Sequence, residues 1–181
     1  MIPNIKKILY PTDLSESAKH SFRYAADLAE RYNARITIIY VIEEMNYAIE
    51  FQVRGMLGGK EWERVKSEKR DQLTQKIKSK IEDFCQEMDS QIDSCRLLVE
   101  DIQITGGTPA EEILDVAKNI GADMIVMGSH GYNILLGALI GSTARKVVRH
   151  SEIPVLVVKL PKDGEQSKGF RNMGMAKEKA L

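Results

Sequence analysis

Residues 35–42 read Arg-Ile-Thr-Ile-Ile-Tyr-Val-Ile, and this stretch limits the possible folds of the chain more than any other. It is rich in β-branched side chains and apolar on both faces, so it predicts a strand that is covered from both sides in the middle of a parallel sheet. Parallel neighbours need a crossover connection, usually a helix, and such a unit crosses over right-handedly. The stretch therefore predicts a parallel sheet with helices packed on its faces.

Further short apolar runs alternate with amphipathic helical patterns along the chain. The other strands are expected at residues 5–10, 97–104, 123–127 and 153–158. Helices are expected at 18–32, 62–88 and 110–120, where apolar residues recur at three- and four-residue steps, and at 144–149. Ser15 is the expected N-cap of the first helix, which should end at Asn33. This alternation predicts an α/β fold with a doubly wound sheet.

The predicted strand at 123–127 runs into two glycines, Gly128 and Gly131, which let the backbone turn tightly and approach a ligand. Nine residues later, Gly141, Ser142 and Thr143 come directly before a predicted helix. Free backbone N–H groups at a helix start bind anions, so phosphate is the expected ligand. The spacing fits neither a Walker A loop, which needs a lysine before the hydroxyls, nor the dinucleotide fingerprint at a first strand-to-helix turn.

The pattern Gly-x2-Gly-x9-Gly-Ser, after a strand ending Val-Met-Gly-Ser-His-Gly, resembles the ATP-binding members of the universal stress protein family. The likeness extends through Tyr-Pro-Thr-Asp at 10–13, Gly-Thr-Pro at 107–109 and Pro-Val-Leu-Val-Val at 154–158. It implies a single domain with a five-stranded parallel sheet of order 3-2-1-4-5. Ligands bind where the strand order reverses, so Asp13 and Gly128 would face one crevice. The last strand would form an apolar edge, which favours a homodimer through that strand.

The resemblance implies an adenine nucleotide in this crevice: ATP, with AMP and ADP as alternatives, and Mg²⁺ or Mn²⁺ bound only through the phosphates. Asp13 would contact the adenosine, although an aspartate here can also cap the first helix. The main chain of Val41 would contact the adenine. One departure is Gly-Ser-Thr-Ala at 141–144, where family members carry Gly-Ser-Val-Thr; it moves a hydroxyl by one place and leaves the backbone N–H groups intact. The candidate binding residues are Pro11, Thr12, Asp13, Val41, Met127, Gly128, His130, Gly131, Gly141, Ser142 and Thr143, with no catalytic or metal-ligating residue assigned.

Composition sets the wider expectations. The chain has 181 residues with 26 basic and 26 acidic side chains, so no overall field draws it to nucleic acid or to a membrane. Without a long apolar run or a signal-peptide pattern it is expected in the cytoplasm, and Cys85 and Cys95 are expected to stay reduced. Residues 1–160 should form the domain, with an excursion at 43–60, either a flap over the site or a surface excursion, and 161–181 should be a loosely held tail.

Three functions fit these features. The first is a nucleotide-binding regulatory stress-response protein, whose occupancy changes its conformation or its binding of a regulatory partner. The second is a slow ATPase or autophosphorylating enzyme, and the third is a nucleotide-free homodimeric interaction module. Near the glycine loop the sequence offers no Walker lysine, no acidic metal-ligand pair and no second carboxylate beside Asp13. Binding is therefore favoured over rapid phosphoryl transfer.

Overall fold

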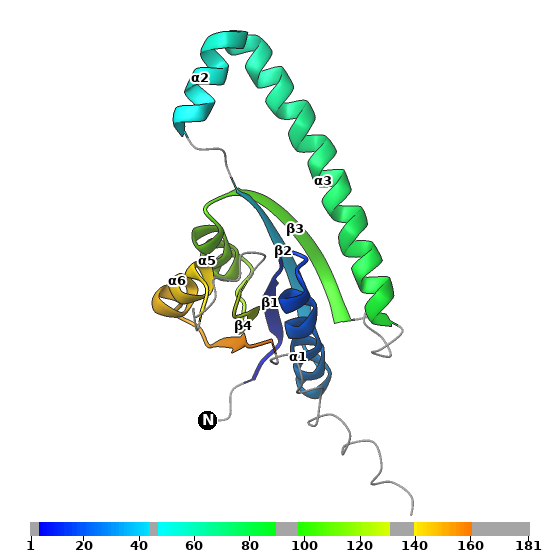
Figure 1. The fold of residues 1–181 in the computed structure, drawn as a ribbon. Helices are drawn as coiled ribbons and strands as arrows, with labels where there is room; N and C mark the ends of the chain where they lie inside the picture. The colour runs from blue at the N-terminus through cyan, green and yellow to red at the C-terminus, as the bar shows by residue number, and fades with distance from the viewer. Residues whose placement is uncertain (1–3, 44–46, 90–97, 131–139, 161–181) are drawn as a thin grey trace, which may run out of the picture.

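A computed structural model describes residues 4–43, 47–89, 98–130 and 140–160, and Figure 1 shows the fold. Its centre is a five-stranded sheet of order β3-β2-β1-β4-β5, in which every neighbouring pair is parallel. The strands are β1 (Lys7–Pro11), β2 (Arg35–Glu43), β3 (Val99–Gly107), β4 (Met124–Gly128) and β5 (Val155–Val158). The predicted α/β fold and strand order are confirmed.

Helices cover both faces of the sheet (Figure 1). They are α1 (Glu16–Tyr32), α2 (Tyr47–Leu57), α3 (Gly59–Asp89), α5 (Pro109–Asn119) and α6 (Ser142–His150). Side chains of α1 and α3 pack with one face of the strands, and those of α5 and α6 pack with the other. Among the described residues, no helix is long and apolar enough to cross a membrane.

The alternation of side chains along the central strands explains why these strands are apolar throughout. In β2, Ile36 and Ile38 are buried against the α1 and α3 side, whereas Ile39 is buried against the α5 and α6 side. In β1, Tyr10 and Leu9 divide between the two clusters in the same way. Successive residues point to opposite faces, so a strand covered twice must be apolar at every position.

Helix α1 begins and ends as predicted. The Ser15 hydroxyl accepts a hydrogen bond from the Ala18 N–H at 3.2 Å, and Asn33 ends the helix in the left-handed conformation, with φ of 51°. Asp13 does not cap the helix, because its Oδ1 accepts from the Ser15 N–H at 3.0 Å, one position before the helix start. The N-cap residue is therefore Ser15, and the Asp13 carboxylate lies just before the positive end of the helix.

Two segments differ from the sequence-based prediction. β3 continues through Gly106 and Gly107, beyond the expected strand end at residue 104, because β2 pairs with it as far as Glu43 opposite Gly107. Strand pairing therefore overrides the local turn preference of two glycines. The segment 43–60, predicted only as a long connection, contains helix α2.

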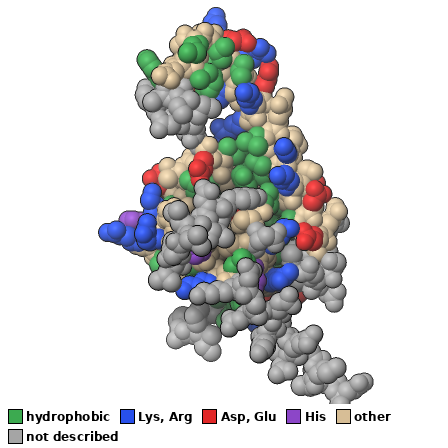
Figure 2. Space-filling view, viewed as in Figure 1, with side chains coloured by type: hydrophobic (Ala, Val, Ile, Leu, Met, Phe, Trp, Pro, Cys, Tyr) green, Lys and Arg blue, Asp and Glu red, His purple; other side chains and the backbone are tan. Residues whose placement is uncertain are grey.

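Helices α2 and α3 form a helical arm that projects beyond the carboxyl ends of β2 and β3 (Figure 1). The Glu50 carboxylate of α2 accepts from the Lys66 ammonium at 2.7 Å and from the Trp62 indole N–H at 3.3 Å, both of α3. Hydrophobic side chains gather at the far end of this arm (Figure 2), where Phe51 and Met56 are 67% and 85% exposed. At the other end of α3, its apolar residues join the domain core.

Candidate functional site

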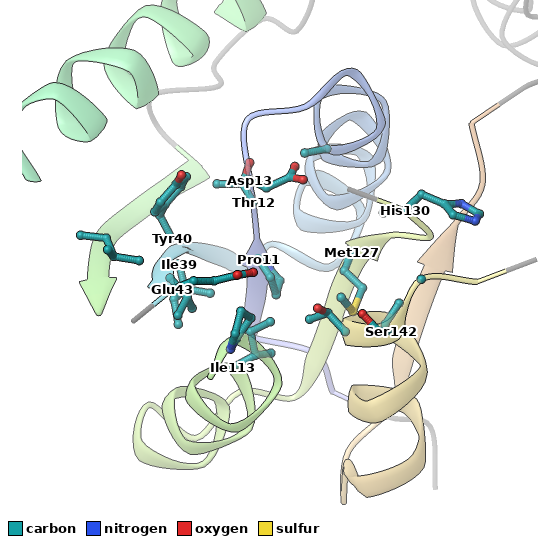
Figure 3. A pocket seen from close by; sticks show the side chains of 18 of the residues that line it. Pro11, Thr12, Asp13, Ile39, Tyr40, Glu43, Ile113, Met127, His130 and Ser142 are labelled. Atoms are coloured by element: carbon teal, nitrogen blue, oxygen red, sulfur yellow. The ribbon is translucent and has the colours of Figure 1, made fainter. Parts of the chain in front are cut away.

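A cavity of about 560 Å³ lies at the carboxyl ends of β1, β2 and β4 (Figure 3). β1 and β4 are the strands at which the chain order reverses, and crevices at this point bind ligands in open α/β sheets. The starts of α5 and α6 complete the wall. The volume is in the range of sites that take small molecules.

The structure brings together residues that are far apart in the sequence. All the predicted site residues except Gly131 line this cavity, and Gly131 lies outside the described residues. The lining residues among those predicted are Pro11, Thr12, Asp13, Val41, Met127, Gly128, His130, Gly141, Ser142 and Thr143.

The turn between β1 and α1 holds Asp13 at the cavity. The Thr12 hydroxyl accepts from the Leu14 N–H at 3.0 Å, and Leu14 is held in the left-handed region, with φ of 64°. Beneath the turn, the Tyr10 hydroxyl donates to the carbonyl oxygen of Ala18, tying β1 to α1. Burial raises the pKa of Tyr10, so its phenol stays a neutral donor. These contacts fix where the Asp13 carboxylate can lie.

Beyond the end of β1, β2 presents to the cavity backbone groups that no described strand pairs with on that side. β1 pairs with β2 only as far as Pro11 opposite Ile39, where the Thr12 N–H donates to the Ile39 carbonyl oxygen at 2.9 Å. β2 runs on to Glu43, paired with β3 on its other side. Successive residues of a strand direct their backbone groups to alternate sides, so those of Val41 point to the same side as those of Ile39. Val41 therefore offers a donor and an acceptor where β1 has ended.

The N-terminus of α6 opens onto the opposite part of the cavity. Gly141 is its N-cap residue and has no side chain that could accept a hydrogen bond from the first N–H groups. Ser142 and Thr143 begin the first turn and line the cavity. The Gly141 N–H donates to the Ser129 carbonyl oxygen at 2.7 Å, and the Ser129 N–H donates to the Val158 carbonyl oxygen at 2.7 Å. The first N–H groups of a helix have no partner within the helix. This geometry suits an anion, because partial positive charge also gathers there.

Gly128 is a glycine for a reason that the sequence did not indicate. A Cβ atom added to it would lie 2.7 Å from the Ser17 hydroxyl and 3.2 Å from the Ser17 carbonyl oxygen. The missing side chain therefore lets α1 approach β4 closely. The Ser17 hydroxyl is buried and has no hydrogen-bond partner within the described ranges.

Ser129 and His130 form a polar pair at the rim of the cavity. The Ser129 side chain is 1% exposed, and its hydroxyl lies 2.9 Å from Nδ1 of His130. Figure 3 shows the imidazole turned away from Asp13 and Met127. His130 therefore belongs to the rim and not to the floor of the cavity.

The charges around the cavity are mostly negative. The described residues that line it include the carboxylates of Asp13 and Glu43 and the imidazole of His130, but no lysine or arginine. No second carboxylate was expected beside Asp13, and the structure corrects this, because Glu43 lines the same cavity. The position of Glu43 could have been inferred from the sequence, because Glu43 follows Val41 by two residues and so lies on the same face of β2. No group of three His, Cys, Asp or Glu suited to a metal ion occurs among the described residues.

Three apolar residues of the cavity wall were not predicted as site residues. Ile39 of β2 and Pro109 and Ile113 of α5 line the cavity together with Met127 of β4. These side chains are typical core residues in the sequence, and only the sheet order places them around one space. They form a surface on which a flat, apolar group such as a nucleobase can pack.

Known proteins show the same sequence pattern and the same fold. The sequence model of the Universal stress protein family matches residues 4–159. The chain is 34% identical over 160 residues to universal stress protein MJ0577 of Methanocaldococcus jannaschii, a match that covers 85% of this chain and 94% of that protein. A solved structure of MJ0577 matches with a TM-score of 0.69 and 32% identity, over 87% of this chain and 98% of that one.

Two more distant structures were solved with ligands. One is a universal stress protein in complex with cAMP, at 20% identity, a TM-score of 0.52 and coverage of 86% of this chain and 98% of that one. The other is the universal stress protein from Archaeoglobus fulgidus in complex with dAMP, at 19% identity, a TM-score of 0.52 and coverage of 87% and 100%. At these identities the likeness shows the fold alone.

Proposed function

Because this chain belongs to the universal stress protein family, we propose that its cavity binds an adenine nucleotide, ATP, and that occupancy regulates the protein's conformation or partner binding in a stress response. One observation carries this proposal. The N-terminus of α6 and the open edge of β2 face the same cavity, at the point where the strand order reverses. The first feature suits phosphate and the second suits a flat base with donors and acceptors at its edge.

Each part of the nucleotide has a matching group in the cavity. The base packs among Ile39, Ile113 and Met127 and contacts the main chain of Val41. The ribose lies at the Asp13 carboxylate, whose oxygens accept hydrogen bonds from hydroxyls. The phosphates lie at the start of α6. The cAMP and dAMP complexes of two distant family members support an adenine nucleotide as the ligand class.

A divalent ion should be needed for the triphosphate and not for the monophosphate. The described lining residues include two carboxylates and no lysine or arginine, so the protein offers little positive charge beyond the start of α6. Mg²⁺ bridging the phosphate oxygens would supply it. We expect calorimetry to show ATP binding that weakens at least tenfold (roughly 1.4 kcal/mol) when EDTA replaces Mg²⁺, while AMP binding changes by less than about twofold.

Mass analysis of the small molecule released on denaturation is the independent check. An adenine nucleotide in that fraction supports the proposal. If neither ATP nor AMP binds in calorimetry and no nucleotide is released, the nucleotide-free interaction module becomes the better account. If ATP binds equally well in EDTA, the role given to the divalent ion is wrong, although nucleotide binding itself stands.

Slow ATP hydrolysis or autophosphorylation is the second candidate function. The Ser129 hydroxyl beside the His130 imidazole favours it, because a base next to a hydroxyl can activate it as a nucleophile. The lack of a lysine or arginine among the described lining residues opposes rapid transfer. We expect turnover far below the roughly 1–100 per second of kinases. Several turnovers per second in a contaminant-controlled sample, abolished by His130→Ala or Asp13→Ala, would show that the protein is an enzyme.

A homodimer through β5 completes the proposal. β5 is an edge strand of the sheet and its residues are mostly valine. An unpaired apolar edge favours pairing with a second copy, and sedimentation at micromolar concentration can test this. The cytoplasmic location, the regulatory partner and the loosely held tail at 161–181 stay predictions, and that tail lies outside the described residues.

A further inference from the structure

Glu43 places a carboxylate in the part of the cavity whose other walls are apolar. It is the last residue of β2 and lines the cavity, on the same face of the strand as Ile39 and Val41. Figure 3 shows its carboxylate directed across the cavity, towards Pro11 at the end of β1. A charged side chain in this position needs a hydrogen-bonding partner or water.

No cation in the described part of the chain neutralises this carboxylate. Glu43 has neither a hydrogen bond nor an ion pair there, and the side chains facing it from β1 and α5 are apolar. Glu112 adds a second negative charge next to the β3 partner of Glu43, because its Oε1 would lie only 2.7 Å from a Cβ on Gly107. Glu43 is exposed, so water solvates its carboxylate when no ligand is bound. A bound ligand must replace that water with donors of its own.

We propose that Glu43 recognises the exocyclic amino group of the base and so selects a 6-aminopurine; this inference rests on the proposed function. An ionised carboxylate only accepts hydrogen bonds, whereas the amino group of adenine donates two. The same negative charge repels phosphates and directs them to the start of α6. Glu43 therefore sets both the orientation of the nucleotide and its preference for an amino group.

The test compares ATP with purine riboside 5′-triphosphate, which carries hydrogen in place of the amino group. GTP is not a suitable probe, because guanine also presents hydrogen-bond donors, and a carboxylate can accept hydrogen bonds from them. Calorimetry in Mg²⁺ would measure both ligands with the wild type, Glu43→Gln and Glu43→Ala. The matched control is Glu111→Gln, an exposed carboxylate in the first turn of α5 that does not line the cavity.

We expect the wild type and Glu111→Gln to bind ATP about tenfold more tightly than the purine riboside nucleotide, as for one hydrogen bond to a charged group. In Glu43→Ala the preference should fall to less than about twofold. Glu43→Gln should lie between, because its amide oxygen still accepts one hydrogen bond. Circular dichroism would confirm that each variant folds.

One result would overturn the inference while leaving the proposed function intact. It is a Glu43→Ala variant that keeps the full preference for ATP, whether both affinities stay the same or change by one common factor. A common factor would reduce the role of Glu43 to its charge. If neither triphosphate binds to the wild type, the proposed function fails and this inference fails with it.

Discussion

Replacing Phe22 with alanine should lower the free energy of unfolding by about 3–5 kcal/mol, the usual cost of removing a fully buried aromatic side chain. Phe22 is 0% exposed. Its ring stands edge-on to Tyr10 and to Phe84, with both centroid distances at 5.0 Å. One side chain of α1 therefore joins β1 to α3. Urea unfolding followed by circular dichroism would measure the loss.

Tyr32→Ala is the matched control, because it removes an aromatic side chain from the same helix. The Tyr32 side chain is 41% exposed, so its removal should cost at most about 1 kcal/mol. If Phe22→Ala lost no more stability than Tyr32→Ala, α3 would not pack on α1 as described. The comparison tests the side of the sheet that carries the helical arm.

The fold could be predicted because its central strands carry an unambiguous pattern. A run that is apolar on both faces, as at Ile36, Ile38 and Ile39, has no stable place except inside a sheet that helices cover twice. The order of the strands came from the family resemblance and not from the pattern. Neither source placed Gly106 and Gly107 in β3, because a glycine pair signals a turn unless a neighbouring strand holds it, and the pairing to Glu43 is a long-range contact.

The site could be predicted in part for the same reason. Candidate residues that belong to a local motif, such as Gly141 before its helix, are visible in the sequence. Glu43 reaches the cavity because β2 is longer than β1, and the cavity lies where β1 ends and β2 continues. Ser17 is hidden in the same way, because its importance comes from the close approach of α1 to Gly128. Such residues need the register before their roles can be inferred.

The register also separates two glycines that look equivalent in the motif. At Gly128 an added side chain meets α1, so a substitution there should damage the packing of the domain. At Gly141 the added Cβ meets, among the described residues, only the carbonyl oxygen of Ser129, at 3.2 Å, and Cα of His130, at 3.6 Å. Gly141 is therefore the better position at which to test the phosphate site without unfolding the protein.

Gly141→Val should lower ATP affinity at least tenfold (roughly 1.4 kcal/mol) while the circular dichroism spectrum stays near that of the wild type. Gly141 has φ of −65° and ψ of 163°, which valine can adopt without strain. Its branched side chain would displace the Ser129 carbonyl oxygen, which accepts the Gly141 N–H, and would crowd the first N–H groups of α6. The phosphate could then no longer reach the positive end of that helix.

The control is Gly55→Val, since a Cβ on this glycine of α2 would meet no atom of the described residues within 4 Å. It should bind ATP as the wild type does. Gly141→Ala adds a single methyl group and should lose less affinity than Gly141→Val, so the loss should grow with the size of the side chain. If calorimetry gave equal ATP affinity for the wild type and both Gly141 variants, the N-terminus of α6 would not be the phosphate site.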